Sequence, residues 1–478
     1  MGIVGIDQGT TSTRALLMDE RGVPELIHSV EHRQIYPQEG WVEHDPEELI
    51  RNIFECASAC TNAIHRVGAI GIDNQGESCL AWDAVSKQAL SPVIVWQDNR
   101  TVGAFEALKQ SGFESETLAR AGLPLDPYFS ASKLAWIVEH VPAAKTALST
   151  GTLRLGTTDA FFLDRLTDRF VTDVSTASRT SLMNLKTLNW DEHLCKAFGV
   201  PIHCLPAIVS TTGDFGTLYV DGQNIPVTAS VVDQQAALYG FGCRKAGDTK
   251  MTFGTGAFAL MVTGNNIVSK SAIGLLSTVA WQLEDQKPVY ALDGGVYTAS
   301  ASLNWAKSLG LFNDFSQINS FKSSPAVHSG LVFVPALAGL ACPHWSPRAR
   351  GTWLGLSLEH TPQQLVQAIL EGVAFRASEV ISAMDEAMPM HNDILIDGGM
   401  SKNPYFVQFL SDVTQRTICR SSQSDTTALG TLMLASRVIG NELQPHNEYA
   451  SVVPDAKADY PITKFRKAVA ISKDWCDS

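Results

Sequence analysis

The chain has 478 residues, of which 45% are hydrophobic and 18% are charged, and a formal net charge of −13. This length exceeds one ordinary core, so two or three domains are expected, and the globular composition excludes a disordered protein. The negative charge argues against a nucleic-acid partner. The longest apolar stretch is interrupted at Pro335 and no signal peptide is visible, so we expect a cytoplasmic protein without membrane insertion. The nine cysteines and twelve histidines lack metal-ligand spacing, so we expect neither disulfides nor a zinc site.

The first predicted element is a hairpin in the sequence GIVGIDQGTTSTRALLMDERG. An apolar strand over residues 2–6 leads into Asp7 and a Gly-Thr turn at residues 9–11, and a second strand covers residues 15–18. Backbone N–H groups in such a turn can converge on an anion, and Arg14 adds a permanent charge. Asp7 can hold Mg²⁺ together with phosphate oxygens, or it can bond its own backbone in an Asx turn. This stretch alone leaves both interpretations open.

The next elements alternate between helix and strand. Asp45 and Pro46 have the pattern of a helix start, and Glu48 stands at the capping-box position. The sequence VGAIGIDNQGES then predicts a buried strand that runs into a polar loop. This order indicates an α/β fold. Glu77 in the loop can accept hydrogen bonds from substrate hydroxyls or be solvated.

A second hairpin of the same kind is predicted in KMTFGTGAFALMVTG. Its glycine, Gly254, follows Gly9 by about half the chain. Two such hairpins predict two related domains that face each other across a cleft. We place the domains at residues 1–244 and 245–478, with the boundary in the turn CRKAGDTK.

Asp233 lies between an apolar strand and a small-residue helix in ASVVDQQAALYGFG. It can cap that helix, or it can be the general base of a phosphoryl transfer, and one residue can do both. Farther on, Thr361, Pro362 and Gln364 predict the start of a long helix. The sequence DILIDGGMSKNP then predicts a strand, a glycine turn and a new helix, where the glycines permit either a nucleotide contact or only a tight turn.

Taken together, the motifs GIDQGTTSTRA, GWVEHDPEEL, VWQDNRT, DQQAALYG, FGTGAFALM and IDGGMSKN resemble those of the FGGY carbohydrate kinases, and within this family the glycerol kinases. Two longer signatures, YFSASKLAWIVEH and GTWLGLSLEHTPQQLVQAILE, are also similar. The resemblance implies two domains of the actin and hexokinase type, which are ribonuclease H-like. It also implies ATP and Mg²⁺ in the interdomain cleft, and a polyol or sugar as the acceptor substrate.

The resemblance also implies roles for individual residues. Asp233 matches the catalytic base and Asp7 the acid associated with the metal. The nucleotide positions are Thr11, Arg14, Thr255, Ser300, Asn304, Gly399 and Asn403. The acceptor positions are Gly76, Glu77, Trp96, Tyr128, Asp233, Gln234 and Phe258. Taken singly, the aromatic residues Trp96, Tyr128 and Phe258 are more often part of a core than of a pocket wall.

Two departures from the family pattern qualify these roles. Glycerol kinases have an arginine at the position of Gly76, and Ser300 and Asn304 replace a glycine and a glutamine at the nucleotide site. The function that the resemblance implies is phosphorylation of a terminal hydroxyl of glycerol by ATP. Because a glycine in place of arginine predicts open space beside the acceptor, a kinase for a four-carbon polyol or ketose (erythritol, threitol or erythrulose) is the alternative within this class. An actin-like or chaperone-type ATPase is the alternative from another class. A homodimer and a homotetramer are both left open.

Overall fold

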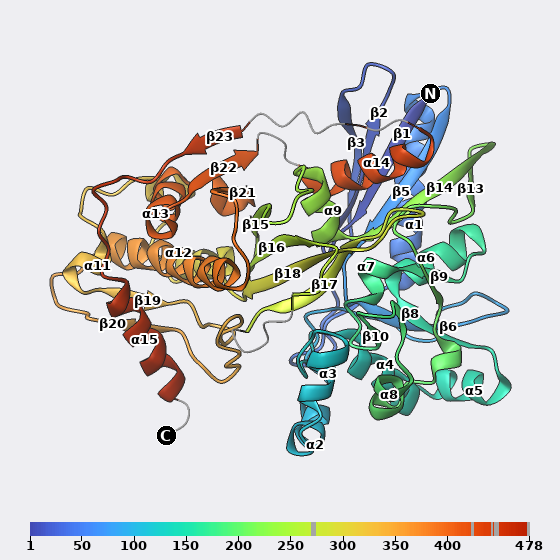
Figure 1. Cartoon of the computed structure of the whole chain (residues 1–478), viewed down its shortest axis with the longest axis horizontal. Helices are drawn as coiled ribbons and strands as arrows, with labels where there is room; N and C mark the ends of the chain where they lie inside the picture. Colours follow the sequence, from blue (N-terminus) through green and yellow to red (C-terminus); the bar gives the residue numbers. More distant parts are fainter. Residues whose placement is uncertain (269–273, 422–424, 441–442, 444–448, 476–478) are drawn as a thin grey trace.

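The computed structural model describes residues 1–268, 274–421, 425–440, 443 and 449–475 (Figure 1). A six-stranded sheet in the first half has the order β13-β14-β5-β1-β2-β3. Its strands are β1 (Gly2–Gln8), β2 (Ser12–Met18), β3 (Pro24–Glu31), β5 (Val67–Asn74), β13 (Thr217–Val220) and β14 (Gln223–Val232). A smaller sheet contains β4 (Glu43–His44), β6 (Cys79–Asp83), β7 (Val93–Ile94) and β8 (Leu153–Thr157). The α-helices of this half are α1 (Pro46–Ala63), α2 (Phe105–Gln110), α3 (Glu114–Arg120), α4 (Ser130–His140), α5 (Pro142–Thr150), α6 (Thr158–Thr167), α7 (Val174–Ala177), α8 (Glu192–Phe198) and α9 (Asp233–Gly240).

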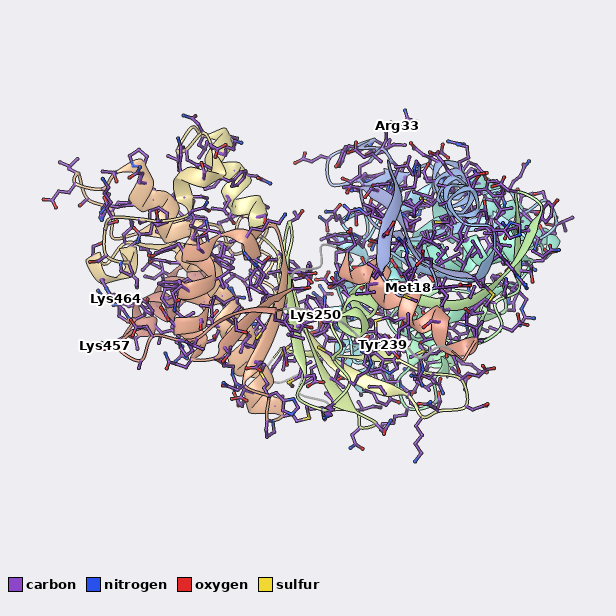
Figure 2. All side chains as sticks on the ribbon, turned by 90° about the horizontal axis from the view of Figure 1, so that it is seen from above. Met18, Arg33, Tyr239, Lys250, Lys457 and Lys464 are labelled. Atoms are coloured by element: carbon purple, nitrogen blue, oxygen red, sulfur yellow. The ribbon has the colours of Figure 1, made fainter. Side chains whose placement is uncertain are left out.

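The second half is built around a seven-stranded sheet in the order β17-β18-β16-β15-β21-β22-β23. Its strands are β15 (Thr249–Phe253), β16 (Ala257–Gly264), β17 (Leu276–Trp281), β18 (Val289–Val296), β21 (Asp393–Gly398), β22 (Thr417–Ser421) and β23 (Tyr449–Val452). The α-helices are α10 (Ser300–Ser308), α11 (Ala326–Ser329), α12 (Pro362–Ala387), α13 (Pro404–Thr414), α14 (Thr426–Val438) and α15 (Ile462–Asp474). Seen from above, the two halves form two lobes, and Tyr239 of α9 and Lys250 of β15 lie where they meet (Figure 2).

Each large sheet contains the same hairpin arrangement. β1 pairs antiparallel with β2 and parallel with β5, and β15 pairs antiparallel with β16 and parallel with β21. Both predicted hairpins are therefore confirmed, and both strands of the first are longer than predicted. The three predicted helix starts at Pro46, Pro362 and Pro404 are also confirmed.

One capping detail differs from the prediction. The Asp45 side chain caps α1 by accepting a hydrogen bond from the Glu47 N–H. The Glu48 side chain does not accept the bond from the Asp45 N–H that would complete a capping box. The carboxylate of Glu48 instead lies 3.7 Å from the Arg33 guanidinium. In α12 the capping box between Thr361 and Gln364 is complete.

Helix α14 comes late in the chain but packs on the first sheet (Figure 1). Its backbone approaches β1 and β5 at two glycines, because a Cβ atom on Gly5 would lie 2.3 Å from the Ala428 carbonyl oxygen, and one on Gly71 would lie 2.6 Å from that of Thr431. α14 also packs on α9, where Gly430 faces the Ala236 carbonyl. The two lobes are thus joined by α9 and α14 beneath the first sheet.

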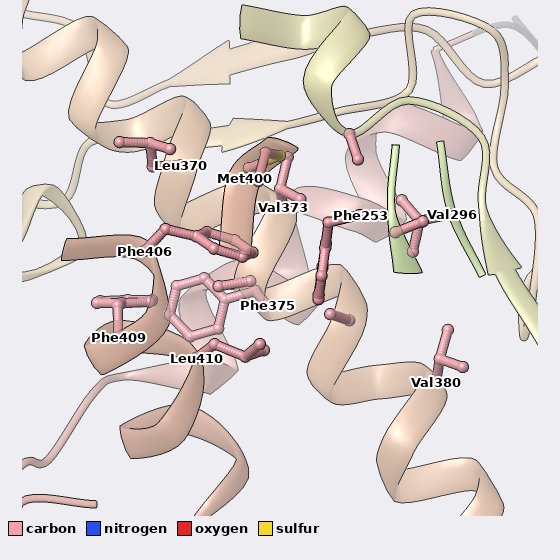
Figure 3. Close-up of a cluster of buried hydrophobic side chains, with 14 of the residues drawn as sticks. Phe253, Val296, Leu370, Val373, Phe375, Val380, Met400, Phe406, Phe409 and Leu410 are labelled. Atoms are coloured by element: carbon pink, nitrogen blue, oxygen red, sulfur yellow. The ribbon is translucent and has the colours of Figure 1, made fainter. Parts of the chain in front are cut away.

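The largest hydrophobic cluster lies in the second lobe and supports its hairpin (Figure 3). Phe253, at the end of β15, packs edge to face against Phe406 of α13. The buried side chains of Val296 and Met400 belong to the same cluster. This packing fixes β15, β18 and the turn after β21 relative to one another. Among the described residues, no helix is long and apolar enough to cross a membrane.

Candidate active site

The first hairpin turn is anchored by two side chains. The indole N–H of Trp96 donates to the Thr10 hydroxyl (3.1 Å), and Nε2 of His32 lies 3.0 Å from the Thr10 carbonyl oxygen. Burial lowers the pKa of His32 to about 4, so this imidazole is neutral near pH 7 and its Nε2 donates to the carbonyl. Thr11, at the tip of the turn, is exposed. His32 was missed in the sequence because a single histidine carries no motif.

Arg14 forms an ion pair across the two halves of the chain. Its guanidinium donates to the Asp425 carboxylate at the start of α14, with a distance of 3.0 Å. The side chain is 42% exposed and lies on β2 opposite Asp7. The predicted phosphate contact would therefore require Arg14 to share its charge between Asp425 and a ligand.

Asp7 lies in register with Asp73 across the parallel strands β1 and β5. Burial raises the pKa of both carboxyls, and the charge of Asp7 raises that of Asp73 further. Oxygen donors of this kind suit Mg²⁺, which commonly takes one or two carboxylates and completes its shell with water and phosphate oxygens. Within the described part of the chain, no group of three or more acidic, His or Cys side chains can hold a metal. The residues therefore fit Mg²⁺ only together with other oxygen ligands.

The second hairpin is tied to helix α10. The carbonyl oxygen of Gly254 accepts a bond from Ser300 N (3.0 Å), and that of Thr255 accepts one from Ala299 N (2.8 Å). Thr255 itself is exposed at the tip of the turn, as Thr11 is in the first hairpin.

Four predicted nucleotide residues line one cavity beside this hairpin. The cavity has a volume of about 440 Å³ and includes Ser300, Asn304, Gly399 and Asn403. Its apolar wall comes from Leu303, Phe315, Ile318 and Met400, and Lys402 adds a cation. An apolar wall with a few polar groups is typical of a small-molecule pocket.

Asn403 of the cavity and Gly398, the residue before Gly399, have defined structural roles. The amide of Asn403 donates to the Ile318 carbonyl (2.8 Å) and accepts from Phe406 N (2.9 Å), so both of its polar atoms are already used by the fold. Gly398 must be glycine, because its φ is +88° and a Cβ atom would lie 2.2 Å from the Phe253 carbonyl oxygen. Gly399 is open by comparison, with only the Ser300 hydroxyl 3.8 Å from its Cβ position.

The three predicted acceptor aromatics gather in one place. The rings of Trp96 and Tyr128 meet edge to face at 5.5 Å, and those of Trp96 and Phe258 meet at 6.4 Å. Tyr128 and Phe258 also line a small cavity of about 20 Å³ with Asp293 and Trp345. These aromatics are half-buried rather than part of a sealed core.

Glu77 is buried and paired, so the solvated alternative is wrong. Its backbone has φ of +61°, a conformation uncommon for a residue with a side chain, and its carboxylate accepts from Nε of Arg179 (2.6 Å). Arg179 also pairs with Asp293 at 2.9 Å. Arg179 lies in the sequence TDVSTASRT, but its role could not be predicted because its partners are 102 and 114 residues away in the chain.

Asp233 is the first residue of α9, and Val232 occupies the N-cap position. Its carboxylate accepts a hydrogen bond from Gln234 N (2.6 Å), so it does bond the helix start. Burial, followed by the charges of Glu77 and Asp7, raises the pKa of Asp233 to about 7. The side chain of Gln234 is in turn held by the ammonium group of Lys250 (2.7 Å), a residue of the other lobe.

Gly76 does not border open space. A Cβ atom at this position would lie 2.5 Å from Cγ2 of Val232, so the valine fills the volume next to the glycine. A side chain at position 76 would therefore collide with Val232 already at its Cβ atom, so the predicted empty region does not begin at Gly76. The reason is that Val232, the last residue of β14, comes from a strand far away in the sequence.

Comparison with known proteins identifies the family. The FGGY family of carbohydrate kinases matches in two parts, its N-terminal domain over residues 2–240 and its C-terminal domain over residues 249–438. The chain therefore belongs to the FGGY family of carbohydrate kinases, and it is a phosphotransferase with an alcohol group as acceptor.

Several individual kinases are similar to the chain over most of its length. The chain is 41% identical to a glycerol kinase of Methylorubrum extorquens, covering 91% of this chain and 89% of that protein. It is 36% identical to a glycerol kinase of Burkholderia multivorans, with 99% and 98% covered. The crystal structure of Plasmodium falciparum glycerol kinase with ADP matches with a TM-score of 0.88 and 30% identity, over 100% of this chain and 97% of that one. A xylulose kinase from Lactobacillus acidophilus shares the fold, with a TM-score of 0.86, 22% identity and coverage of 100% and 98%. The predicted two-domain α/β fold is confirmed.

Proposed function

We propose that the chain transfers the γ-phosphoryl group of ATP to a terminal hydroxyl of glycerol, giving glycerol 3-phosphate and ADP. The observation that carries this proposal is the Asp233 carboxyl, with a pKa of about 7, in electrostatic contact with Glu77 and Tyr128 of the acceptor group. A general base works best when its pKa lies near the operating pH. The similarity to glycerol kinases at 36–41% identity supports glycerol as the acceptor.

In the proposed step, Asp233 accepts the proton of the acceptor hydroxyl while that oxygen attacks the γ-phosphorus. The bond from this phosphorus to the β,γ-bridging oxygen breaks, and ADP leaves. The turns at Thr11 and Thr255 would offer backbone N–H groups to the phosphates, and the cavity of Ser300 and Asn304 would hold the nucleoside. Bound Mg²⁺ would offset phosphate charge, and Asp7 is the residue that we expect to hold it.

The four-carbon alternative is less well supported than glycerol, because Val232 occupies the space beside Gly76. The test is ADP release from ATP with glycerol, erythritol, threitol or erythrulose, and with no acceptor. We expect the highest kcat/KM with glycerol and little ADP release without acceptor. A higher kcat/KM with a four-carbon compound would replace glycerol as the substrate. Full turnover without acceptor would instead indicate the ATPase alternative.

A further inference from the structure

A buried lysine of the second lobe reaches the helix that begins with Asp233. Lys250 of β15 is fully buried, and its ammonium group donates to the side-chain oxygen of Gln234 (2.7 Å) and to the Thr252 hydroxyl (3.0 Å). Gln234 follows Asp233 in α9, and its backbone N–H donates to the Asp233 carboxylate (2.6 Å). Lys250 is therefore joined to Asp233 through a single residue, at the place where the two lobes meet (Figure 2).

The ammonium group of Lys250 is held by neutral oxygens. Both of its hydrogen-bond acceptors are uncharged, and within the described part of the chain no carboxylate forms an ion pair with it. A buried ammonium group without an ion pair is costly, because it has lost its hydration. A charge that the fold keeps at such a cost, inside a cleft and beside other ionisable groups, is typical of a functional site.

Lys250 and Asp233 act on each other electrostatically. Burial lowers the pKa of Lys250, and the charges of Asp397, Asp233 and Asp293 oppose this effect. Burial and then the charges of Glu77 and Asp7 raise the pKa of Asp233, whereas the Gln234 N–H and the charge of Lys250 lower it.

The ionisable groups that face Asp233 come from several elements. They are Asp7 of β1, Asp73 of β5, Glu77 of the loop that follows β5, Tyr128 before α4, and Lys250 of β15. Lys250 is the cation of this set. A carboxyl among other acids stays protonated to a higher pH unless a cation offsets their repulsion.

We propose that Lys250 is a positioning residue for Asp233: it holds Gln234 beside the base across the boundary between the lobes, and its charge keeps the Asp233 carboxyl ionised and able to accept a proton. This inference rests on the proposed role of Asp233 as the general base. It assigns a task in the reaction to a residue of the second lobe that lies outside both phosphate turns.

Thr252 offers a matched control. Its hydroxyl is the other acceptor of the Lys250 ammonium group and comes from the same strand, but it carries no charge. Thr252→Val removes this hydrogen bond and leaves the ammonium group in place. Lys250→Met removes the charge with little change in volume, and Lys250→Gln is a second neutral variant that retains an N–H donor.

The first test is the pH dependence of kcat/KM for glycerol, measured between about pH 5 and pH 9 with saturating MgATP. The rise of kcat/KM expected near pH 7 in the natural protein should move upward by about half a pH unit or more in Lys250→Met and Lys250→Gln. Thr252→Val should keep the natural midpoint. Thermal melting verifies that each variant is folded, and Lys250→Gln decides the test if Lys250→Met does not fold.

The second test needs no turnover. The melting advantage of Asp233→Asn over the natural protein should grow with pH and level off once Asp233 is ionised in the fold. When Lys250→Met or Lys250→Gln is added to both proteins, this levelling should occur at a pH higher by a similar amount.

An unmoved melting profile in the folded neutral variants would overturn the proposal, and so would a shift of equal size in Thr252→Val. A shifted melting profile with an unmoved midpoint of kcat/KM would mean that Asp233 does not set the pH dependence of turnover. That result would contradict the proposed function of Asp233 and leave its pairing with Lys250 intact.

Discussion

The Asp233→Asn variant tests the proposed base through both stability and catalysis. The pKa of Asp233 rises from 3.8 in a model peptide to about 7 in the fold. Between these values the folded protein keeps a proton that the unfolded chain has lost, so ionisation of Asp233 makes the fold less stable as pH rises from about 4 to above 7. Asparagine cannot ionise, and its amide oxygen can still accept from Gln234 N. The variant should therefore lack this pH-dependent loss.

The pKa shift sets the size of the effect. A shift of about 3 units corresponds to at most ~4 kcal/mol at high pH, since one unit is worth ~1.4 kcal/mol, and relaxation of the site will reduce it. We expect Asp233→Asn to unfold at a higher temperature than the natural protein near pH 8, in EDTA, and to lose this advantage near pH 4. Its kcat should fall by ~10²-fold or more, as expected for loss of a general base. The kcat/KM of the natural protein should rise with pH through about 7.

Glu371 provides a control outside the site. Burial raises its pKa to about 7 as well, but its partners are Tyr405 and the N–H groups of Ala326 and Val327 on the far side of the second lobe's core. Glu371→Gln should change the pH dependence of melting in the same direction and retain turnover. Near-normal turnover of Asp233→Asn, or melting that keeps the natural pH dependence, would refute the assignment of Asp233.

Three further changes address neighbouring residues. Asp7→Ala should reduce kcat with MgATP while glycerol binding, measured by calorimetry without metal, stays unchanged; an equal loss of glycerol affinity would mean that Asp7 only supports the hairpin. Gly76→Arg alone should destabilise the protein by collision with Val232, whereas the double variant Gly76→Arg/Val232→Ala should raise the kcat/KM ratio of glycerol over erythritol by roughly tenfold. An unmoved ratio would remove Gly76 from the acceptor site. Arg179→Lys should raise the KM for glycerol by about tenfold, because lysine lacks the planar fork through which Arg179 bonds Glu77 with Nε and Asp293 with an Nη nitrogen. An unchanged KM would make this ion pair purely structural.

Local patterns predicted the hairpins and the helix starts, whereas the strands of the first hairpin are longer than predicted. The Gly-Thr turns at Gly9 and Gly254 and the helix starts at Pro46 and Pro362 depend on neighbouring residues, and all four are present in the structure. The family motifs added the candidate nucleotide residues, four of which line one cavity. Asp73 could have been predicted by the same reasoning, because it lies near the end of a buried strand. That strand runs parallel to the strand that has Asp7 near its end. The pairing of Asp7 with Asp73 follows only from the register of their two strands.

Other features depend on contacts between distant segments and could not be predicted locally. Val232 beside Gly76, Arg179 beside Glu77 and α14 beneath the first sheet each join segments that are far apart in the chain. The family resemblance showed that Gly76 stands where glycerol kinases have an arginine. It did not predict that Val232 lies in the adjacent space. The volume of a pocket is set by all of its walls, and the sequence of one wall does not determine it.

The two lobes share one strand arrangement but differ in charge at equivalent positions. In the first lobe the strand-end acid Asp73 faces the acid Asp7, and in the second the corresponding acid Asp397 faces Thr252. Lys250, two residues before Thr252 on the same face of β15, places a buried cation in the second lobe and bonds Gln234 of α9 in the first. Burial, and after it the negative charges of Glu77 and Asp7 in the first lobe, raise the pKa of Asp233. Because both lobes share the pairing of a hairpin with a parallel strand, this difference in charge arises from the side chains at a few matched positions.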